Sequence, residues 1–373
     1  MNEPSARYVP LRLADPNLIF QGKRPLVGMT LEEMEGLLGE FGEPRYRARQ
    51  LFQWVYEKGV KDFGAMTNLP LSLRQKLAEN TLLVLLEQEM EQKDPTTQTS
   101  KFLFRLYDGQ TVESVLMRHD YGNSACVTTQ VGCRMGCTFC ASTVGGLVRN
   151  LTAGEIVDQV IMMQKCLPPG QRISSVVLMG SGEPMENYDN VLKAIRLMHD
   201  PAGLNIGYRH ITLSTSGLVP GIRRLADENL PITLAVSLHA PNNELRSQLM
   251  PVNRLFPLEQ VIDAAREYAE KTGRRVTYEY LLIQGVNDQR EHALELASLL
   301  KGSLAHVNLI PLNPVAERPQ YRRPSREQVV QFRKWLEDAG IAATIRREMG
   351  GEIEAACGQL RNRAARQRGP ARS

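Results

Sequence analysis

The sequence predicts an α/β protein in which a small N-terminal helical domain precedes a partial (βα)6 TIM-like barrel. Apolar residues recur at helical spacing in the first ninety residues. From residue 125 onward, short apolar segments typical of strands alternate with amphipathic segments typical of helices. Small polar residues and glycines follow several of these strands, at the end where parallel barrels carry their chemistry.

The first helix is expected to begin at Thr30, because Thr30 and Glu33 have the spacing of a capping box. A second helix is expected around Leu51, and a third over residues 71–80. The second helix begins with arginines on either side of a tyrosine, in the segment 45–49. This segment suits contact with RNA phosphates and bases, and a charged face turned to solvent explains it equally well.

Residues 92–100 are polar and are expected to form a linker. Asp108 and Gly109 then separate two alternating segments, which predicts a hairpin. Candidate barrel strands are 126–130, 175–179, 210–214, 233–237, 276–282 and 306–310, with a last strand near 342–346. The expected divisions are an extension (1–28), a helical accessory domain (29–90), a linker and hairpin (91–124), a barrel (125–350) and a C-terminal segment (351–373).

Charge is nearly balanced outside the C-terminal end. The net charge is +4, and residues 361–373 contain five arginines and no acidic residue. A polyanion would therefore have to bind a local patch. No apolar run is long enough to span a membrane and the N-terminus lacks a signal-peptide pattern, so we expect a cytoplasmic protein. In the reducing cytoplasm, six cysteines indicate metal or redox chemistry rather than a disulfide scaffold.

Cys133, Cys137 and Cys140 follow the first barrel strand, with three and then two intervening residues. Thiolates are soft ligands that suit zinc or an iron–sulfur cluster. Gly132 and Gly136 allow the loop to curl so that the sulfurs converge. A structural zinc site would need a fourth ligand, and none is evident nearby. Three thiolates on a four-iron cluster would leave one iron open to a substrate.

Polar groups at the ends of later strands predict a ligand site. Glu183 follows Gly182 in a glycine-rich turn and could accept a hydrogen bond from an ammonium group. Small polar residues at other strand ends suit ribose hydroxyls and a carboxylate. His239 has two equally weighted interpretations from the sequence, a ligand contact or a structural histidine.

The cysteine loop resembles the signature of the radical S-adenosylmethionine (SAM) superfamily. Such a resemblance implies a [4Fe–4S] cluster that binds SAM at its open iron and cleaves it to a 5′-deoxyadenosyl radical. Segments 149–156, 237–241, 249–253 and 355–360 resemble more closely the RlmN family of adenine-C2 methyltransferases of 23S rRNA and tRNA. This resemblance extends from Met29 to Arg361, nearly the whole chain.

The family resemblance implies roles for individual residues. Cys357 matches the cysteine that SAM methylates and that then carries the methyl group to adenine. Cys126 matches the cysteine that releases the product through a transient disulfide with Cys357, and Glu113 matches the general base. Without the resemblance, Glu113 would be interpreted as a solvent-facing hairpin residue and Cys126 as an inert buried thiol. The expected SAM contacts are Gly182, Glu183, Ser214, Ser237, Leu238, His239 and Asn313.

Two other functions remain open from the sequence. The first is C8 methylation of the same adenine by a sister family, in which the residue matching Pro184 is typically replaced. The second is a non-catalytic RNA-binding protein that carries a cluster or zinc. The resemblance also implies an electron donor such as a flavodoxin or ferredoxin. The segment 346–354 and Ser181 depart from the family pattern without removing a catalytic group, and Cys166 matches no family role.

Overall fold

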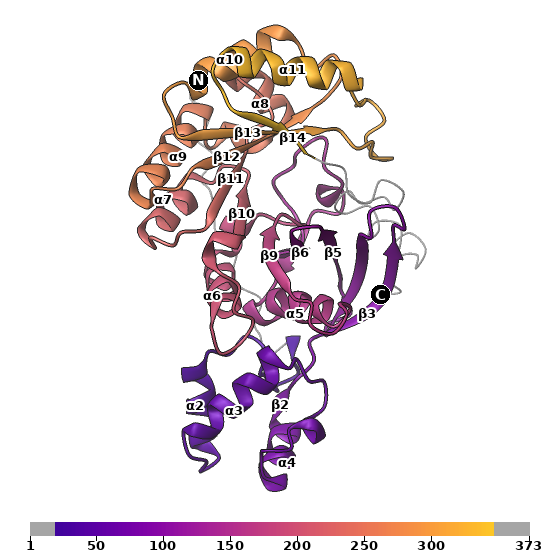
Figure 1. Cartoon of the computed structure of the whole chain (residues 1–373), viewed down its shortest axis with the longest axis vertical. Coiled ribbons are helices and arrows are strands. Elements are labelled where there is room, and N and C mark those ends of the chain that lie inside the picture. Colours follow the sequence, from indigo (N-terminus) through magenta and orange to yellow (C-terminus); the bar gives the residue numbers. More distant parts are fainter. Residues whose placement is uncertain (1–18, 347–373) are drawn as a thin grey trace, which may run out of the picture.

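The computed structural model describes residues 19–346. The accessory domain lies at one end of the molecule, in indigo in Figure 1. Its helices are α2 (Leu31–Glu40), α3 (Tyr46–Phe52) and α4 (Leu71–Asn80), and a short parallel pair joins β1 (Arg24–Pro25) to β2 (Thr81–Leu82). The capping box of Thr30 and Glu33 is present, as predicted. Helix α3 continues as one π-helical turn over Gln53–Glu57.

One ten-stranded sheet forms the main body. Its order is β14-β13-β12-β11-β10-β9-β6-β5-β4-β3. The strands that pair in antiparallel fashion are β3 (Leu86–Lys93), β4 (Ser100–Leu106), β5 (Thr111–His119) and β6 (Gly122–Cys126). The parallel part continues from β6 through β9 (Ile173–Leu178), β10 (Ile211–Thr215), β11 (Thr233–Ser237), β12 (Val276–Leu282), β13 (Ala305–Pro311) and β14 (Ala343–Ile345).

The predicted parallel strands and hairpin are confirmed, with two corrections. The expected linker 92–100 is shorter than predicted, because β3 extends to Lys93 and pairs with β4. The expected strand 126–130 is split: β6 ends at Cys126, and β7 (Gln130–Gly132) pairs instead with β8 (Leu147–Asn150) in a separate small sheet. Apolar alternation cannot reveal this change of partner, because both strands are buried.

The register gives the large sheet two unlike faces. One face is apolar and packs in the same core as the helices, through residues such as Val176, Leu213 and Val236. We call the opposite side the polar face; strand pairing places Lys101, Glu113, Cys126, Ser214, Ser237, Glu279 and Asn308 on it. Such side chains can reach a ligand held inside the curved sheet.

Seven helices accompany the parallel part: α5 (Ala153–Gln164), α6 (Tyr188–His199), α7 (Val219–Asp227), α8 (Asn243–Leu249), α9 (Leu258–Thr272), α10 (Arg290–Leu300) and α11 (Arg326–Asp338). In Figure 1 the later helices lie at the end of the molecule opposite the accessory domain. Within residues 19–346, none of the helices combines the length and apolar character that a membrane crossing requires.

Candidate active site

The cysteine loop connects β7 to β8. Cys133 and Cys137 are buried and Cys140 is half-buried. The loop closes on itself where the Cys133 N–H donates to the Gly146 carbonyl at 3.1 Å. It is also held from outside, because the Thr138 N–H donates to the Leu249 carbonyl at 2.9 Å. Gly132 and Gly136 have positive φ angles of 82° and 72°, which confirms the predicted curl.

The burial of these thiols fits a role as metal ligands. Burial raises the pKa of Cys133 to about 12 and that of Cys137 well above its ordinary value. The thiols therefore need a metal to become thiolates. Among residues 19–346, no group of three His, Cys, Asp or Glu side chains could hold a single metal ion. Cysteine thiolates are the donors that hold iron–sulfur clusters, so these three soft donors fit a [4Fe–4S] cluster.

Glu183 lies at the carboxyl end of β9 in a tightly packed turn. Gly182 has a φ of 110°, and a Cβ there would lie 2.6 Å from the Gln130 side chain. The buried Glu183 carboxylate accepts the Ser216 N–H at 2.7 Å and the Met185 N–H at 3.0 Å. Burial raises its pKa. These two backbone donors do not use all the lone pairs of the carboxylate, which can also accept from an ammonium group.

The other expected SAM contacts occupy successive strand ends. Ser214 lies on β10 and Ser237 ends β11, both on the polar face. Leu238 is fully buried, and its N–H donates to the Glu279 carbonyl at 3.0 Å. Asn313 follows β13 and is exposed. Glu183, Ser214 and Ser237 therefore lie at the ends of the neighbouring strands β9, β10 and β11. Asn313 follows β13 and lies farther along the sheet.

His239 adopts a positive φ of 58° directly after β11. Its Nδ1 accepts the Leu281 N–H at 3.0 Å, and burial lowers the pKa of the ring to about 3. The imidazole is therefore neutral with its proton on Nε2, which makes that nitrogen a donor. The ring also meets Phe139 of the cysteine loop edge-on, with 5.0 Å between centroids. Both interpretations of His239 agree with this geometry, since Nδ1 is structural and Nε2 is a donor.

Glu113 and Cys126 lie on the same side of two neighbouring strands. Cys126 pairs with Val115, and Glu113 is two residues before Val115 on β5. Both side chains are buried, so the interpretation of Glu113 as a solvent-facing residue is wrong. The Glu113 carboxylate forms an ion pair with the Lys101 ammonium at 2.9 Å. Cys357 lies outside the described residues.

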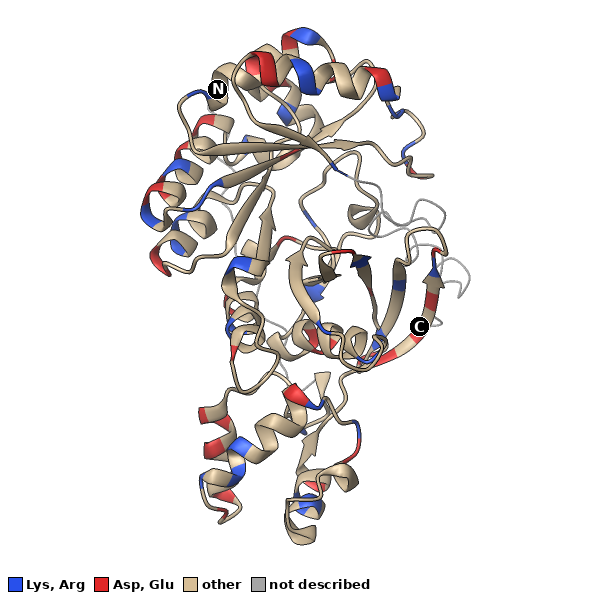
Figure 2. Cartoon of the chain, in the orientation of Figure 1, with Lys and Arg blue, Asp and Glu red and all other residues tan. Residues whose placement is uncertain are grey.

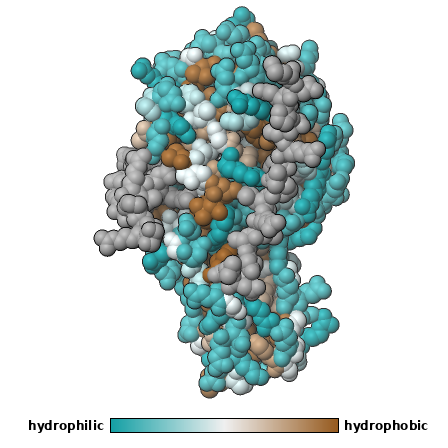
Figure 3. Space-filling view, turned by 180° about the vertical axis from the view of Figure 1, so that it is seen from behind, coloured by the Kyte–Doolittle hydropathy of each residue, from teal (hydrophilic) through white to brown (hydrophobic). Residues whose placement is uncertain are grey.

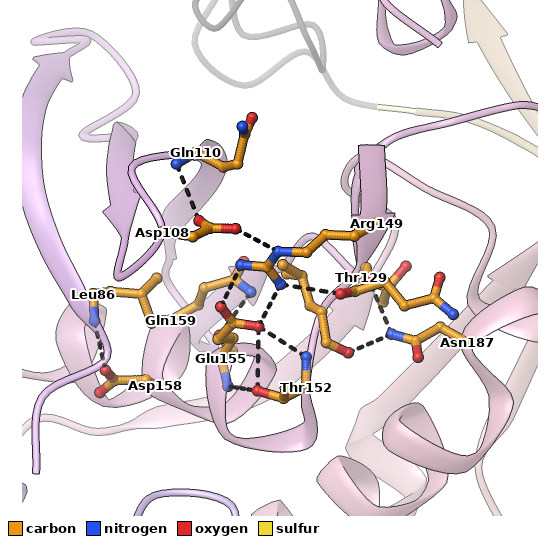
Figure 4. Close-up of polar contacts among 12 residues, drawn as sticks. Leu86, Asp108, Gln110, Thr129, Arg149, Thr152, Glu155, Asp158, Gln159 and Asn187 are labelled. Carbon is orange, nitrogen blue, oxygen red and sulfur yellow. Dashed lines mark hydrogen bonds and ion pairs between the residues drawn. The ribbon is translucent and has the colours of Figure 1, made fainter. Parts of the chain in front are cut away.

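A polar network runs from the hairpin turn, where Asp108 is exposed, through the half-buried Arg149 to the buried Glu155, as Figure 4 shows. Arg149 on β8 contacts Asp108 at 2.7 Å in the hairpin turn and Glu155 at 2.7 Å on α5. Gln159, one turn farther along α5, accepts the Thr128 N–H at 2.8 Å. The strand that carries Glu113 and the loop that carries the cysteines are therefore held to one helix.

Comparison with known proteins identifies the family. The radical SAM superfamily model matches residues 127–297, and the ribosomal RNA large subunit methyltransferase N-terminal domain matches residues 25–83. The chain is 73% identical over 361 residues to the "Probable dual-specificity RNA methyltransferase RlmN" of Symbiobacterium thermophilum, covering 96% of this chain and 97% of the relative. It is 54% identical over 341 residues to the protein of the same name from Alkaliphilus oremlandii, covering 91% and 98%.

The chain belongs to the RlmN family. A crystal structure of a radical SAM methyltransferase from Sphaerobacter thermophilus superimposes with a TM-score of 0.87 at 49% identity, covering 90% of this chain and 98% of that one. The fold is thus a radical SAM α/β fold with an N-terminal RlmN domain. The chain is an RlmN-type radical SAM RNA methyltransferase, and its cofactors are a [4Fe–4S] cluster and SAM.

The accessory domain of this RlmN-family chain mixes charges of both signs, as Figure 2 shows. Arg45 forms an ion pair with Glu35, and Arg47 donates to the Asn68 carbonyl at 2.8 Å. Tyr46 is exposed. The view in Figure 3 shows a mostly hydrophilic surface on this domain, with hydrophobic residues gathered on the main body above it. Contact between RNA and helix α3 stays a prediction.

Two buried cations in the main body of this RlmN-family fold were not expected from the sequence. Lys101 and Arg246 are both fully buried. Lys101 lies in an alternating strand, and Arg246 lies on a short helix that reads as amphipathic. No local pattern marks either position, because a lone cation in such a segment is ordinarily solvated.

Proposed function

We propose that this chain forms 2-methyladenosine in 23S rRNA and in tRNA, through a methyl group carried on Cys357. The proposal depends on one observation: the buried carboxylate of Glu113 and the buried thiol of Cys126 share one face of the paired strands β5 and β6. An RNA-binding protein without catalytic activity needs neither group there. The relatives named dual-specificity RNA methyltransferases support both substrates.

The cofactors would be held by groups on the loop and strand ends. Cys133, Cys137 and Cys140 are assigned to the cluster. Glu183 would accept the SAM ammonium, and the neutral His239 would donate from Nε2. The remaining assigned SAM contacts are Gly182, Ser214, Ser237, Leu238 and Asn313. When bound, the cluster and SAM supply the radical that activates the methyl group on Cys357.

Glu113 is assigned as the base that accepts the proton from C2 of adenine. The Lys101 ammonium, 2.9 Å away, holds this carboxylate in position on β5. Cys126 is assigned to attack the sulfur of Cys357. A sulfur–sulfur bond forms and the sulfur–carbon bond to the RNA breaks. The released carbon keeps the electron pair and takes up a proton, which completes the methyl group. A dithiol would then restore both thiols by exchange.

Several finer features belong to the same proposal. Pro184, at the start of the short 3-10 helix Pro184–Asn187, supports the assignment of C2 rather than C8 methylation, because the C8 family typically has another residue there. A low-potential flavodoxin or ferredoxin would provide electrons one at a time. The cytoplasmic location expected from the sequence also remains part of this proposal.

The decisive experiment combines the anaerobically reconstituted enzyme with SAM, a reductant and unmodified 23S rRNA or tRNA. Mass spectrometry of the nucleosides should find 2-methyladenosine with both RNAs. Finding only 8-methyladenosine would retain the mechanism and overturn the assigned position. Cleavage of SAM without any methylated base would contradict the substrate assignment.

Two cysteine variants separate the assigned roles. Cys126→Ala should accumulate a covalent protein–RNA adduct, visible as a shifted band, because product release needs its thiolate. Cys166→Ala is the matched control, because the half-buried Cys166 thiol donates to the backbone carbonyl of Met162 at 3.6 Å and matches no family role. It should form 2-methyladenosine at an unchanged rate. Equal behaviour of the two variants would remove Cys126 from the mechanism.

A further inference from the structure

Arg246 is a buried cation that has no carboxylate as a hydrogen-bond or ion-pair partner among residues 19–346. Its side chain is fully buried on α8. One terminal nitrogen, Nη2, donates to the Ser216 carbonyl at 2.7 Å and to the Ser237 carbonyl at 3.3 Å. The other, Nη1, donates to the Asn253 side chain at 2.8 Å and to the Phe256 carbonyl at 3.4 Å. These partners are all neutral.

Arg246 occupies the space between two strand ends and the cysteine loop. Ser216 directly follows β10 and Ser237 ends β11, so the guanidinium bridges the two strands at the cofactor end of the sheet. The segment that carries Arg246 also touches the loop, because the Leu249 carbonyl accepts the Thr138 N–H.

A fully buried cation without an anion is costly. Hydrogen bonds to carbonyls satisfy its donors and do not neutralise its charge. The cofactor of this family provides the missing negative charge, since three thiolates outweigh the positive charge of an oxidised [4Fe–4S]2+ core. Reduction adds one more negative charge to the same unit. Charge close to a cluster is one of the factors that set its reduction potential.

We propose that Arg246 is the counter-charge of the [4Fe–4S] cluster and raises its reduction potential by stabilising the reduced form. The inference depends on the proposed assignment of Cys133, Cys137 and Cys140 as cluster ligands. Arg246 acts here as a positioning and charge-compensating residue that touches neither SAM nor RNA. Its effect falls on the one-electron step, in which a low-potential donor is oxidised and the cluster is reduced.

The test is a redox titration of the reconstituted enzyme, followed by electron paramagnetic resonance with SAM and RNA omitted. Arg246→Gln should lower the ratio of reduced to oxidised cluster about tenfold at the wild-type midpoint, a shift of about 59 mV for one electron. Arg254→Gln is the matched control, since it removes the same charge from the exposed Arg254 on the adjacent 3-10 helix Pro251–Arg254. It should leave the midpoint unchanged.

Arg246→Lys keeps the charge and loses the forked geometry, so it should titrate close to the wild-type midpoint. Wild-type potentials in the glutamine variant would overturn the proposal. If the glutamine variant holds no cluster, the lysine variant is the deciding measurement. Normal iron content and a normal potential in that variant would support the proposed role of the positive charge. Loss of the cluster from the lysine variant as well would overturn the proposal. Omitting RNA keeps this result separate from the proposed C2 methylation, which could fail while the potential still shifts.

Discussion

Among residues 19–346, one fully buried cation lies in the antiparallel part of the sheet and one lies beside the parallel part, and their charges are balanced in different ways. On β4, Lys101 meets the carboxylate of Glu113 at 2.9 Å, and both side chains are nearly free of solvent contact. Beside β10 and β11, Arg246 meets only carbonyls and an amide among the described residues. The first charge is balanced within the protein. The second is balanced only when an anionic group binds next to it, which suits a cofactor site.

The largest effect is expected where a matched pair is broken. Lys101→Met would leave the Glu113 carboxylate buried without its cation, and breaking such a pair costs about 3–5 kcal/mol of unfolding free energy. Urea denaturation of the cluster-free protein, followed by circular dichroism, measures this loss. Adding Glu113→Leu should recover most of it, because both charges of the pair are then gone. A double variant as unstable as the single one would contradict the comparison.

Arg223→Gln is the surface control for that measurement. Arg223 forms an ion pair with Glu267 at 3.0 Å, and both side chains are about half exposed. Water screens such a pair, so its loss should hardly move the denaturation midpoint. A large shift here would mean that burial does not explain the effect at Lys101.

An intermediate effect is expected at Asp158 on α5, a buried acid held by backbone donors. Its carboxylate accepts the Leu85 and Leu86 N–H groups at 3.0 and 3.1 Å, and burial raises its pKa to about 6. The folded state therefore keeps a proton that the unfolded chain releases near pH 4. The contribution of the Asp158 carboxyl to the free energy of unfolding should therefore fall by roughly 3 kcal/mol as pH rises from about 4 to 6.

Denaturation midpoints between pH 4 and pH 7 measure this dependence. Asp158→Asn removes the titrating group and should flatten this part of the profile. Asp189→Asn alters an exposed acid that pairs with Arg224 and should leave the profile unchanged. An Asp158→Asn profile as steep as the wild type would assign the pH dependence to other groups.

Among the buried charges, the smallest effect is expected at Arg246 in the cluster-free protein. Arg246→Gln leaves carbonyls of Ser216 and Ser237 with fewer donors, which costs about 1–3 kcal/mol, while removing an unpaired buried charge offsets part of that loss. The loaded protein should lose more, because the variant then lacks the counter-charge. Parallel denaturation of cluster-free and loaded proteins measures the difference. Equal losses would mean that the cofactor does not use this charge.

Local elements were readable from the sequence because their signals lie within a few residues. The capping box at Thr30 and Glu33, the helix over 71–80 and the Asp108–Gly109 turn are all present. Five of the six candidate barrel strands and the last strand near 342–346 are present too. The split between β6 and β7 was not readable, because it depends on which partner each strand finds.

The sequence by itself determined the family, the three-cysteine loop and the order of polar strand ends, because each is encoded in contiguous residues. Only the tertiary structure decided how buried charges are matched. Lys101 meets Glu113 through the register of β4 and β5, and Arg246 reaches Ser216 across 30 residues of chain. The spacing of residues along the chain does not predict such contacts. They follow from packing, where the cost of an unpaired buried charge makes the partner matter.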